Sequence, residues 1–170
     1  MISTLIMVVA LSRAAVSYQA PRLVTADTGA KRAVLQYIRA QNERSPALMG
    51  PVLAAKFLTF SATGTTVATD TRPQMLAGLQ QGSENQRMSL SLGKLVSCGR
   101  TAGTQKWVVP TPMGNENCWV KMTPGEARAL INVQIKIRVS PTQWQTETGQ
   151  FIFYLKRQAG KWVVYGSQPG

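Results

Sequence analysis

Strict alternation of apolar and polar residues marks the C-terminal part of the chain. Across residues 131–139 every second residue is Ile or Val, and each residue between them is Asn, Gln, Lys or Arg. A period of two is typical of a half-buried strand. Residues 151–156 and 162–165 are rich in aromatic and β-branched residues and flank a short break that contains Gly160. This pattern predicts a closing antiparallel hairpin, which other strands and a helical layer must cover because it is too apolar to be stable alone.

The alternation begins earlier, near Arg87. It predicts three further strands, over residues 87–97, 106–109 and 118–122. Residues 110–117 are expected to form a loop, and residues 141–148 a link to the closing hairpin. Residues 123–128 begin with the spacing of a capping box, which predicts one or two helical turns.

Helical spacing dominates the N-terminal part instead. Val34, Tyr37 and Ile38 share one side of a helix that Asp27 or Thr28 can cap and that ends near residue 44. Polar and charged residues take the opposite side. The pattern therefore predicts an amphipathic helix that covers one face of the strands.

Two shorter helices are expected after the first. Pro51 fits the first turn of a helix that contains residues 52–57. Residues 70–71, followed by Pro73, predict the start of a third helix. The Thr-rich residues 57–70 predict two short strands around a Gly-containing break.

Helices early and strands late predict an α+β domain over residues 30–168, with a curved antiparallel sheet and the N-terminal helices packed on one face. The chain resembles the nuclear-transport-factor-2-like superfamily, which includes ketosteroid isomerase and the polyketide cyclases. The resemblance rests on the amphipathic helix at residues 30–43, the helix start at residues 70–73 and the closing hairpin at residues 151–164. It implies a cone-like sheet whose mouth holds a small apolar ligand.

The resemblance also implies where a pocket would lie. Ile135, Phe151 and Phe153 face inward on the predicted strands, and Tyr37 can reach a cone from the first helix. These four are the candidate pocket residues. Tyr37 also has a purely structural interpretation, because a Tyr on an apolar helix face is commonly part of the core. Residues 60–63 lack the acidic groups that isomerase-like enzymes often carry in that region.

The inventory of titratable residues argues against proton-transfer catalysis. The chain has no His and seven acids, so triads and other His-based general-base schemes are excluded. Each acid falls in a loop or at the end of a predicted element, where helix capping explains Asp70 and Glu126. No metal or cofactor site is predicted, because His and a Gly-rich phosphate loop are both missing.

The N-terminus carries a candidate export signal. Residues 5–11 form an unbroken apolar run that is too short to span a bilayer, and small residues follow it up to Ala20. We therefore expect a signal peptide over residues 1–20, a flexible lead-in over residues 21–29 and a periplasmic or secreted protein. A buried first strand or helix is the alternative, because residues 1–4 carry no Lys or Arg.

Cysteine usage agrees with export. Cys98 and Cys118 are the two cysteines of the chain, and both fall in predicted β structure. Because an exported chain with two cysteines commonly pairs them, a disulfide between them is expected. Two buried thiols in a reducing compartment are the alternative.

The chain is strongly basic, with 19 Lys and Arg against 7 Asp and Glu and a formal net charge of +12. Four cations are predicted on the outward face of the strands: Lys121, Lys136, Arg138 and Lys156. Such a face can bind an acidic protein partner or an anionic envelope surface, while a solvated sheet exterior is the plainer interpretation. Nucleic acid is disfavoured, because aromatic residues are not interleaved with the basic ones.

Two functions of different classes follow from these observations. The first is an exported, non-catalytic domain that acts in protein–protein interaction or envelope assembly, as a single chain or as a homodimer. The second is a small-molecule-binding or isomerase-like protein that uses an apolar cone pocket.

Overall fold

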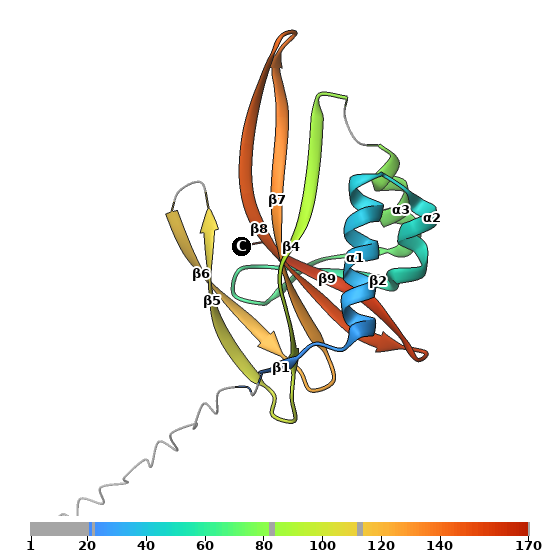
Figure 1. The fold of residues 1–170 in the computed structure, drawn as a ribbon, viewed down its shortest axis with the longest axis vertical. Helices are drawn as coiled ribbons and strands as arrows, with labels where there is room; N and C mark the ends of the chain where they lie inside the picture. The colour runs from blue at the N-terminus through green and yellow to red at the C-terminus, as the bar shows by residue number, and fades with distance from the viewer. Residues whose placement is uncertain (1–20, 22, 82–83, 112–113, 170) are drawn as a thin grey trace, which may run out of the picture.

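A seven-stranded mixed sheet lies between helices on one face and a two-stranded ribbon on the other (Figure 1). The computed structural model describes residues 21, 23–81, 84–111 and 114–169. The predicted signal peptide at residues 1–20 lies outside them, and within them no helix has both the length and the apolarity needed to cross a membrane. The fold is α+β with the helices packed on one face of a curved sheet, as the sequence predicts.

The sheet has the strand order β1-β4-β7-β8-β9-β2-β3. Neighbouring strands are antiparallel except β2 and β9, which run parallel. Strands β7 and β8 extend beyond the helices as a long arm (Figure 1). The strands are β1 (Leu23–Thr25), β2 (Leu53–Phe60), β3 (Thr66–Thr71), β4 (Gln86–Cys98), β7 (Ala127–Ser140), β8 (Gln143–Gln158) and β9 (Lys161–Pro169), with β5 (Gly103–Thr111) and β6 (Gly114–Met122) forming the ribbon.

Three helices and a short 3-10 turn precede the long strands. They are α1 (Thr28–Asn42), α2 (Pro46–Met49), the 3-10 turn η1 (Gly50–Val52) and α3 (Arg72–Gln80). Asp27 caps α1 by accepting a hydrogen bond from the Gly29 amide at 2.5 Å, as predicted. Thr71 and Gln74 form a capping box at α3, where the sequence predicts a helix start.

The main core lies between α1 and the inward face of the sheet. Val34 and Tyr37 of α1 pack in one cluster with Ile131, Phe153 and Leu155 of β7 and β8, and all five are buried. Odd-numbered residues of β7 and β8 therefore face the helices, and the alternation seen in the sequence separates core from outer face. Each such side chain stabilises the fold by about 1.5–3 kcal/mol through its burial.

The ribbon of β5 and β6 covers part of the outer face of the sheet and forms a second core. Trp107, Val109 and Val120 of the ribbon pack with Ile152 and Tyr154 of β8. These β8 residues alternate with those that face the helices, so this stretch of β8 is buried on both sides. A strand buried on both faces is apolar without interruption, which accounts for the composition of the closing hairpin.

A buried arginine ties the ribbon to the sheet. Arg128 on β7 is 1% exposed, and its guanidinium pairs with Glu126 at 2.8 Å. Its Nε donates to the Lys121 carbonyl of β6 at 2.8 Å, and its guanidinium carbon lies 4.1 Å from the centre of the Tyr154 ring. The Tyr165 hydroxyl donates to Oε2 of Glu126 at 2.7 Å. These contacts connect β6, β7, β8 and β9 at one point.

The segment after α2 corrects the predicted second helix. Pro51 does start a helical turn, but the turn ends at Val52, and Leu53 begins β2. Strand β2 pairs with β3 on one side and with β9 on the other. Hydrogen bonding on both edges outweighs a weak local preference for helix. The two strands predicted within residues 57–70 are present as the end of β2 and as β3.

The helical turns predicted for residues 123–128 are also wrong. The segment makes a single turn, in which the Glu126 amide donates to the Thr123 carbonyl at 3.1 Å, and β7 then begins. Gly125 has a φ of +78°, a left-handed conformation that favours glycine and stops a right-handed helix. Glu126 consequently pairs with Arg128 instead of completing a capping box.

Strands extend into three segments that were predicted to be irregular. The loop at residues 110–117 is largely taken up by the ends of β5 and β6, and the link at residues 141–148 mostly belongs to β8. The lead-in at residues 21–29 contains β1, which pairs with the end of β4, and the first turn of α1. Pairing within the β5–β6 and β7–β8 hairpins makes the first two segments regular, whereas β1 is held by a strand distant in the sequence.

The expected disulfide is not formed in the structure: Cys98 and Cys118, both among the described residues, are not bonded to each other. Cys98 ends β4 in the sheet, whereas Cys118 lies on β6 of the ribbon. Their thiols donate to different carbonyls, those of Thr101 at 3.2 Å and Pro169 at 3.7 Å. The prediction placed both residues in one meander, and the ribbon takes Cys118 out of it.

Candidate functional site

A cavity of about 260 Å³ lies on the helix-facing side of the sheet, bounded by α1 and α3. Met88 of β4 is 39% exposed and marks its rim. The apolar part of the lining comes from the three strands β2, β4 and β8 and from α3. Its residues are Phe57, Met75, Met88, Leu90, Phe151 and Phe153.

Alternation along the strands brings these side chains to one place. Phe151 and Phe153 face the helices because Ile152 and Tyr154 face the ribbon. Leu90 of β4 pairs with Val133 of β7, so β4 contributes to the same inward face. The cavity is therefore the unfilled part of the cone between the sheet and the helices.

One side of the cavity is polar. Tyr37, Gln41, Thr59 and Ser167 line it. Gln41 Nε2 donates to the Tyr37 hydroxyl oxygen at 3.1 Å, which leaves the phenol hydrogen able to donate to another acceptor. Burial raises the pKa of Tyr37 to about 12, so the group is neutral at physiological pH. The Tyr37 ring meets Phe153 edge-on, with centroids 4.9 Å apart, and this contact fixes its position.

Acidic groups lie elsewhere. Among the residues that the structure describes, no carboxylate or thiol lines this cavity. Asp27, Glu43 and Glu126 each pair with an arginine outside it. Hydrogen bonds from the Gly29 amide and then from Arg157 lower the pKa of Asp27. Within the described part of the chain, no three His, Cys, Asp or Glu residues gather as a metal site requires.

Two acids that were expected in loops lie in strands, Glu116 in β6 and Glu147 in β8. The Cα partner of Glu147 is Ile135 of β7. The pleat places Glu147 on the same face as Phe151. It is exposed, and it lies about 13 Å from Phe151 along the strand at ~3.3 Å per residue. Glu147 therefore faces the helix side of the sheet without lining the cavity, although Met88, two strands away in the same row, does line it.

Three of the four candidate pocket residues line the cavity. They are Tyr37, Phe151 and Phe153. Ile135 is not among the lining residues and instead packs at the margin of the main core. Met88 belonged to the predicted alternation, but its place at the rim depends on β4 lying beside β7, and no local pattern indicates that neighbour.

The four candidate cations of the outer face do not form one group. Lys136 and Arg138 lie near the tip of the arm, where Arg87 is the Cα partner of Lys136. Lys136 also pairs with Thr146, so it is about 33 Å from Lys156 along β8 at ~3.3 Å per residue. Lys121 lies on β6 of the ribbon. The structure thus brings two of the four together and adds Arg87, which the sequence did not single out.

Comparison with known proteins indicates a fold. No protein-family model and no curated protein matches the sequence. An LEH-like epoxide hydrolase from M. tuberculosis is similar in structure, with a TM-score of 0.53 and 7% identity over 86% of this chain and 82% of that one. A ketosteroid isomerase-like protein from Erwinia carotovora atroseptica is also similar, with a TM-score of 0.51 and 10% identity over 82% of this chain and 90% of that one.

A third solved structure is a nuclear transport factor 2-like superfamily protein from Salmonella enterica, with a TM-score of 0.49 and 10% identity over 82% of this chain and 85% of that one. Identities this low carry the fold and leave the activity open. The order of elements, the helix-covered curved sheet and the similarities to the epoxide hydrolase and to the ketosteroid isomerase-like protein agree, and the chain has the nuclear-transport-factor-2-like fold.

Proposed function

We propose that the protein binds a small, largely apolar ligand in the cone cavity and does not convert it chemically. The observation that carries this proposal is the composition of the lining. Six apolar side chains surround a space whose polar side holds one neutral phenol. Such a combination of an apolar wall and a few orienting polar groups is characteristic of small-molecule sites.

Cavity size restricts the ligand. Sites for drug-sized ligands span about 300–1,000 Å³, and this cavity of about 260 Å³ lies just below that range. It suits a compact molecule with the bulk of a monoterpene better than a four-ring steroid. Met75 and Met88 border the space, and their flexible side chains can adapt to ligands of slightly different shape.

The polar side suggests the ligand's functional group. Tyr37 already accepts from Gln41, so its hydroxyl is oriented to donate. A carbonyl, ether or epoxide oxygen on the ligand would accept that hydrogen bond. The raised pKa of Tyr37 supports the same role, because the phenol keeps its hydrogen well above neutral pH.

Binding without turnover follows from the chemistry of the lining. Proton transfer at neutral pH needs a base within hydrogen-bond reach of the substrate. The described lining supplies phenol, amide and aliphatic hydroxyl groups, and none of these is a base of suitable strength. Glu147 is the nearest carboxylate on the inward face of β8, but it lies about 13 Å beyond Phe151.

The Tyr37→Phe variant tests the proposal with a matched pair of probes, menthone and its parent hydrocarbon p-menthane. We expect Tyr37→Phe to bind menthone about three- to tenfold more weakly than the full wild-type chain, because one neutral hydrogen bond is lost. Affinity for p-menthane should not change, since the ring that packs on Phe153 remains. Isothermal titration calorimetry measures both affinities.

Glu147→Gln serves as the control variant, because Glu147 faces the same side of the sheet outside the cavity. It should bind both probes like the wild type. Failure of the wild-type chain to bind either probe, or an equal loss of affinity for both probes in Tyr37→Phe, would overturn the proposed role of the cavity.

A second candidate function is the exported interaction domain expected from the sequence. The observation that favours it is the grouping of Arg87, Lys136 and Arg138 near the tip of the arm. Under this proposal an acidic envelope protein docks there after removal of residues 1–20. Capture of such a partner that weakens with salt and is lost in Lys136→Glu would support it, and capture that this variant leaves unchanged would count against it.

A further inference from the structure

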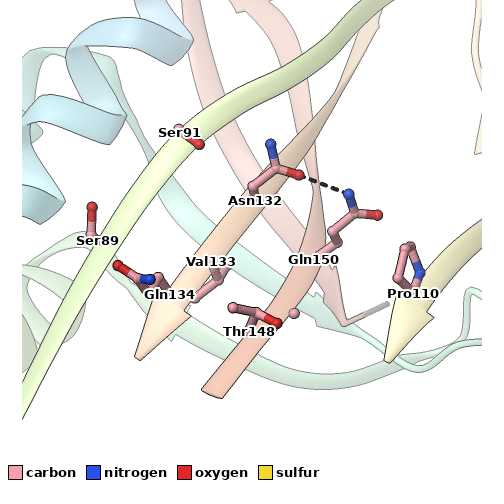
Figure 2. Close-up of a pocket in the computed structure, with 9 residues that line it drawn as sticks. Ser89, Ser91, Pro110, Asn132, Val133, Gln134, Thr148 and Gln150 are labelled. Atoms are coloured by element: carbon pink, nitrogen blue, oxygen red, sulfur yellow. Dashed lines mark hydrogen bonds between the residues drawn. The ribbon is translucent and has the colours of Figure 1, made fainter. Parts of the chain in front are cut away.

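A second cavity, of about 410 Å³, lies on the outer face of the sheet beside the ribbon. Figure 2 shows its polar side chains on three neighbouring strands, with Pro110 of β5 across from them. Every lining residue that the structure describes is uncharged. We call this cavity the outer groove, and its polar residues are Ser89, Ser91, Asn132, Gln134, Thr148 and Gln150.

The strand register arranges these groups in two rows. Asn132 of β7 is the Cα partner of both Ser91 of β4 and Gln150 of β8. Gln134 is likewise the partner of Ser89 and Thr148, two residues further along. The rows are therefore about 7 Å apart, at ~3.3 Å per residue. A flat ligand lying on this face would meet a hydrogen-bonding group on each strand in both rows.

An unpaired acceptor is built into the groove wall. Gln150 Nε2 donates to Asn132 Oδ1 at 2.7 Å, which fixes the two amides against each other (Figure 2). Gln150 Oε1 is buried and has no hydrogen-bond partner. Leaving a buried acceptor unpaired is unfavourable, so a ligand donor that pairs with it would gain affinity. A ligand donor can reach this oxygen if the hydrogen-bonded amides of Gln150 and Asn132 turn together, which their soft terminal torsions allow.

We infer that the outer groove binds an uncharged saccharide. Hydroxyl groups are both donors and acceptors, so they can pair with Gln150 Oε1 and with the Ser, Thr and amide groups of both rows. The Pro110 ring offers an apolar surface to the C–H face of a sugar ring. An apolar ligand would leave the polar rows unpaired, at a cost that the groove's composition does not offset.

Charge and topology favour an uncharged saccharide over an anionic ligand or a peptide. Cations flank the groove at both ends without lining it: Arg87 and Lys136 are one row beyond Ser89 and Gln134, and Lys94, the partner of Leu130, is one row beyond Ser91 and Asn132. Anionic ligands would therefore lack a partner inside it. A peptide strand binds a sheet edge through backbone groups, whereas this groove presents side chains from the face of three paired strands.

Glycan-array binding of the full chain to short cello-oligosaccharides and N-acetylglucosamine oligomers tests the inference. We expect binding that changes little with salt, because no ion pair is involved. Gln150→Met keeps the side-chain length and removes the amide, and it should weaken binding about three- to tenfold. Thr148→Val removes a single exposed hydroxyl from the same groove and should have a similar effect without disturbing the strand.

Gln143→Met is the matched control, since Gln143 is exposed on β8 and lies outside the groove. It should bind like the wild type. The inference is overturned if the wild-type chain binds none of these oligosaccharides, if Gln143→Met loses as much affinity as Thr148→Val, or if only charged glycans bind and salt removes them. Tyr37→Phe should leave saccharide binding unchanged, so failure here is distinguishable from failure of the cone cavity.

Discussion

Replacing Arg128 with Ala is expected to lower the free energy of unfolding by about 3–4 kcal/mol. Arg128 is 1% exposed and pairs with Glu126 at 2.8 Å. It also donates to the Lys121 carbonyl and covers the Tyr154 ring. The substitution leaves a cavity and a Glu126 carboxylate without its arginine, although the hydrogen bond from the Tyr165 hydroxyl to that carboxylate remains. The ribbon should lose its main polar attachment to the sheet.

Urea denaturation followed by circular dichroism measures this loss. Arg39→Ala is the matched control, because Arg39 forms an ion pair of similar length with Glu43 at the surface of α1. An exposed pair contributes about 0–1 kcal/mol, so this variant should unfold nearly like the wild type. A cost below about 1 kcal/mol for Arg128→Ala would show that the buried pair does not hold the ribbon.

Gly166→Ala should cost about 2–3 kcal/mol, because the added methyl group has no room. A Cβ at this position would lie 2.7 Å from the Leu58 carbonyl oxygen and 2.8 Å from a ring carbon of Phe60. The carbonyl is part of the backbone of β2, which is paired with β9 here. Relief of the contact would require the two parallel strands to move apart.

Gly78→Ala is the control of opposite sign. A Cβ on Gly78 in α3 meets nothing within 4 Å, so the change should stabilise the protein by about 0.5–1 kcal/mol through helix propensity. Thermal unfolding of the two variants in parallel should show a lower Tm for Gly166→Ala and a higher Tm for Gly78→Ala. Equal and small shifts of Tm for both would contradict the close approach of β2 and β9.

Local signals account for the parts of the fold that the sequence predicts. The helix cap of α1 at Asp27, the capping box of α3 at Thr71 and the alternation along β7 each depend on residues close in the sequence. Those physical causes act before any tertiary contact forms, which is why a pattern can indicate them. The closing hairpin of β8 and β9 belongs to the same class.

Pairings between distant segments account for the rest. Nothing near Leu53 in the sequence indicates that it begins a strand, β2, that pairs with β9 and β3. The ribbon has the residues of two ordinary strands, and only the pairing of β4 with β7 excludes it from the sheet. That exclusion places Cys98 and Cys118 in different sheets and buries Arg128 beneath the ribbon. Neither feature is indicated by residues close in the sequence.

The residues of the candidate site also divide into those that local patterns predict and those that depend on distant strand pairing. Tyr37, Phe151 and Phe153 follow from periodicity and from the implied cone, and they line the cavity. Phe57 was placed on a helix and reaches the cavity from β2. Ile135 has the correct inward orientation and its Cα partner Met88 lines the cavity, but Ile135 itself packs at the margin of the main core. Orientation is encoded locally, whereas the position of an unfilled space depends on which strands are neighbours.

Methionine methyl NMR during titration with menthone tests the central claim most directly. Met75 and Met88 line the cone cavity, while Met122 is buried in the second core under the ribbon. We predict saturable shifts of the Met75 and Met88 methyl signals, an unmoved Met122 signal and menthone recovered unchanged. Shifts that appear at Met122 but not at Met75 and Met88, an absence of any shift, or conversion of menthone that Glu147→Gln abolishes would contradict a passive ligand site in the cone.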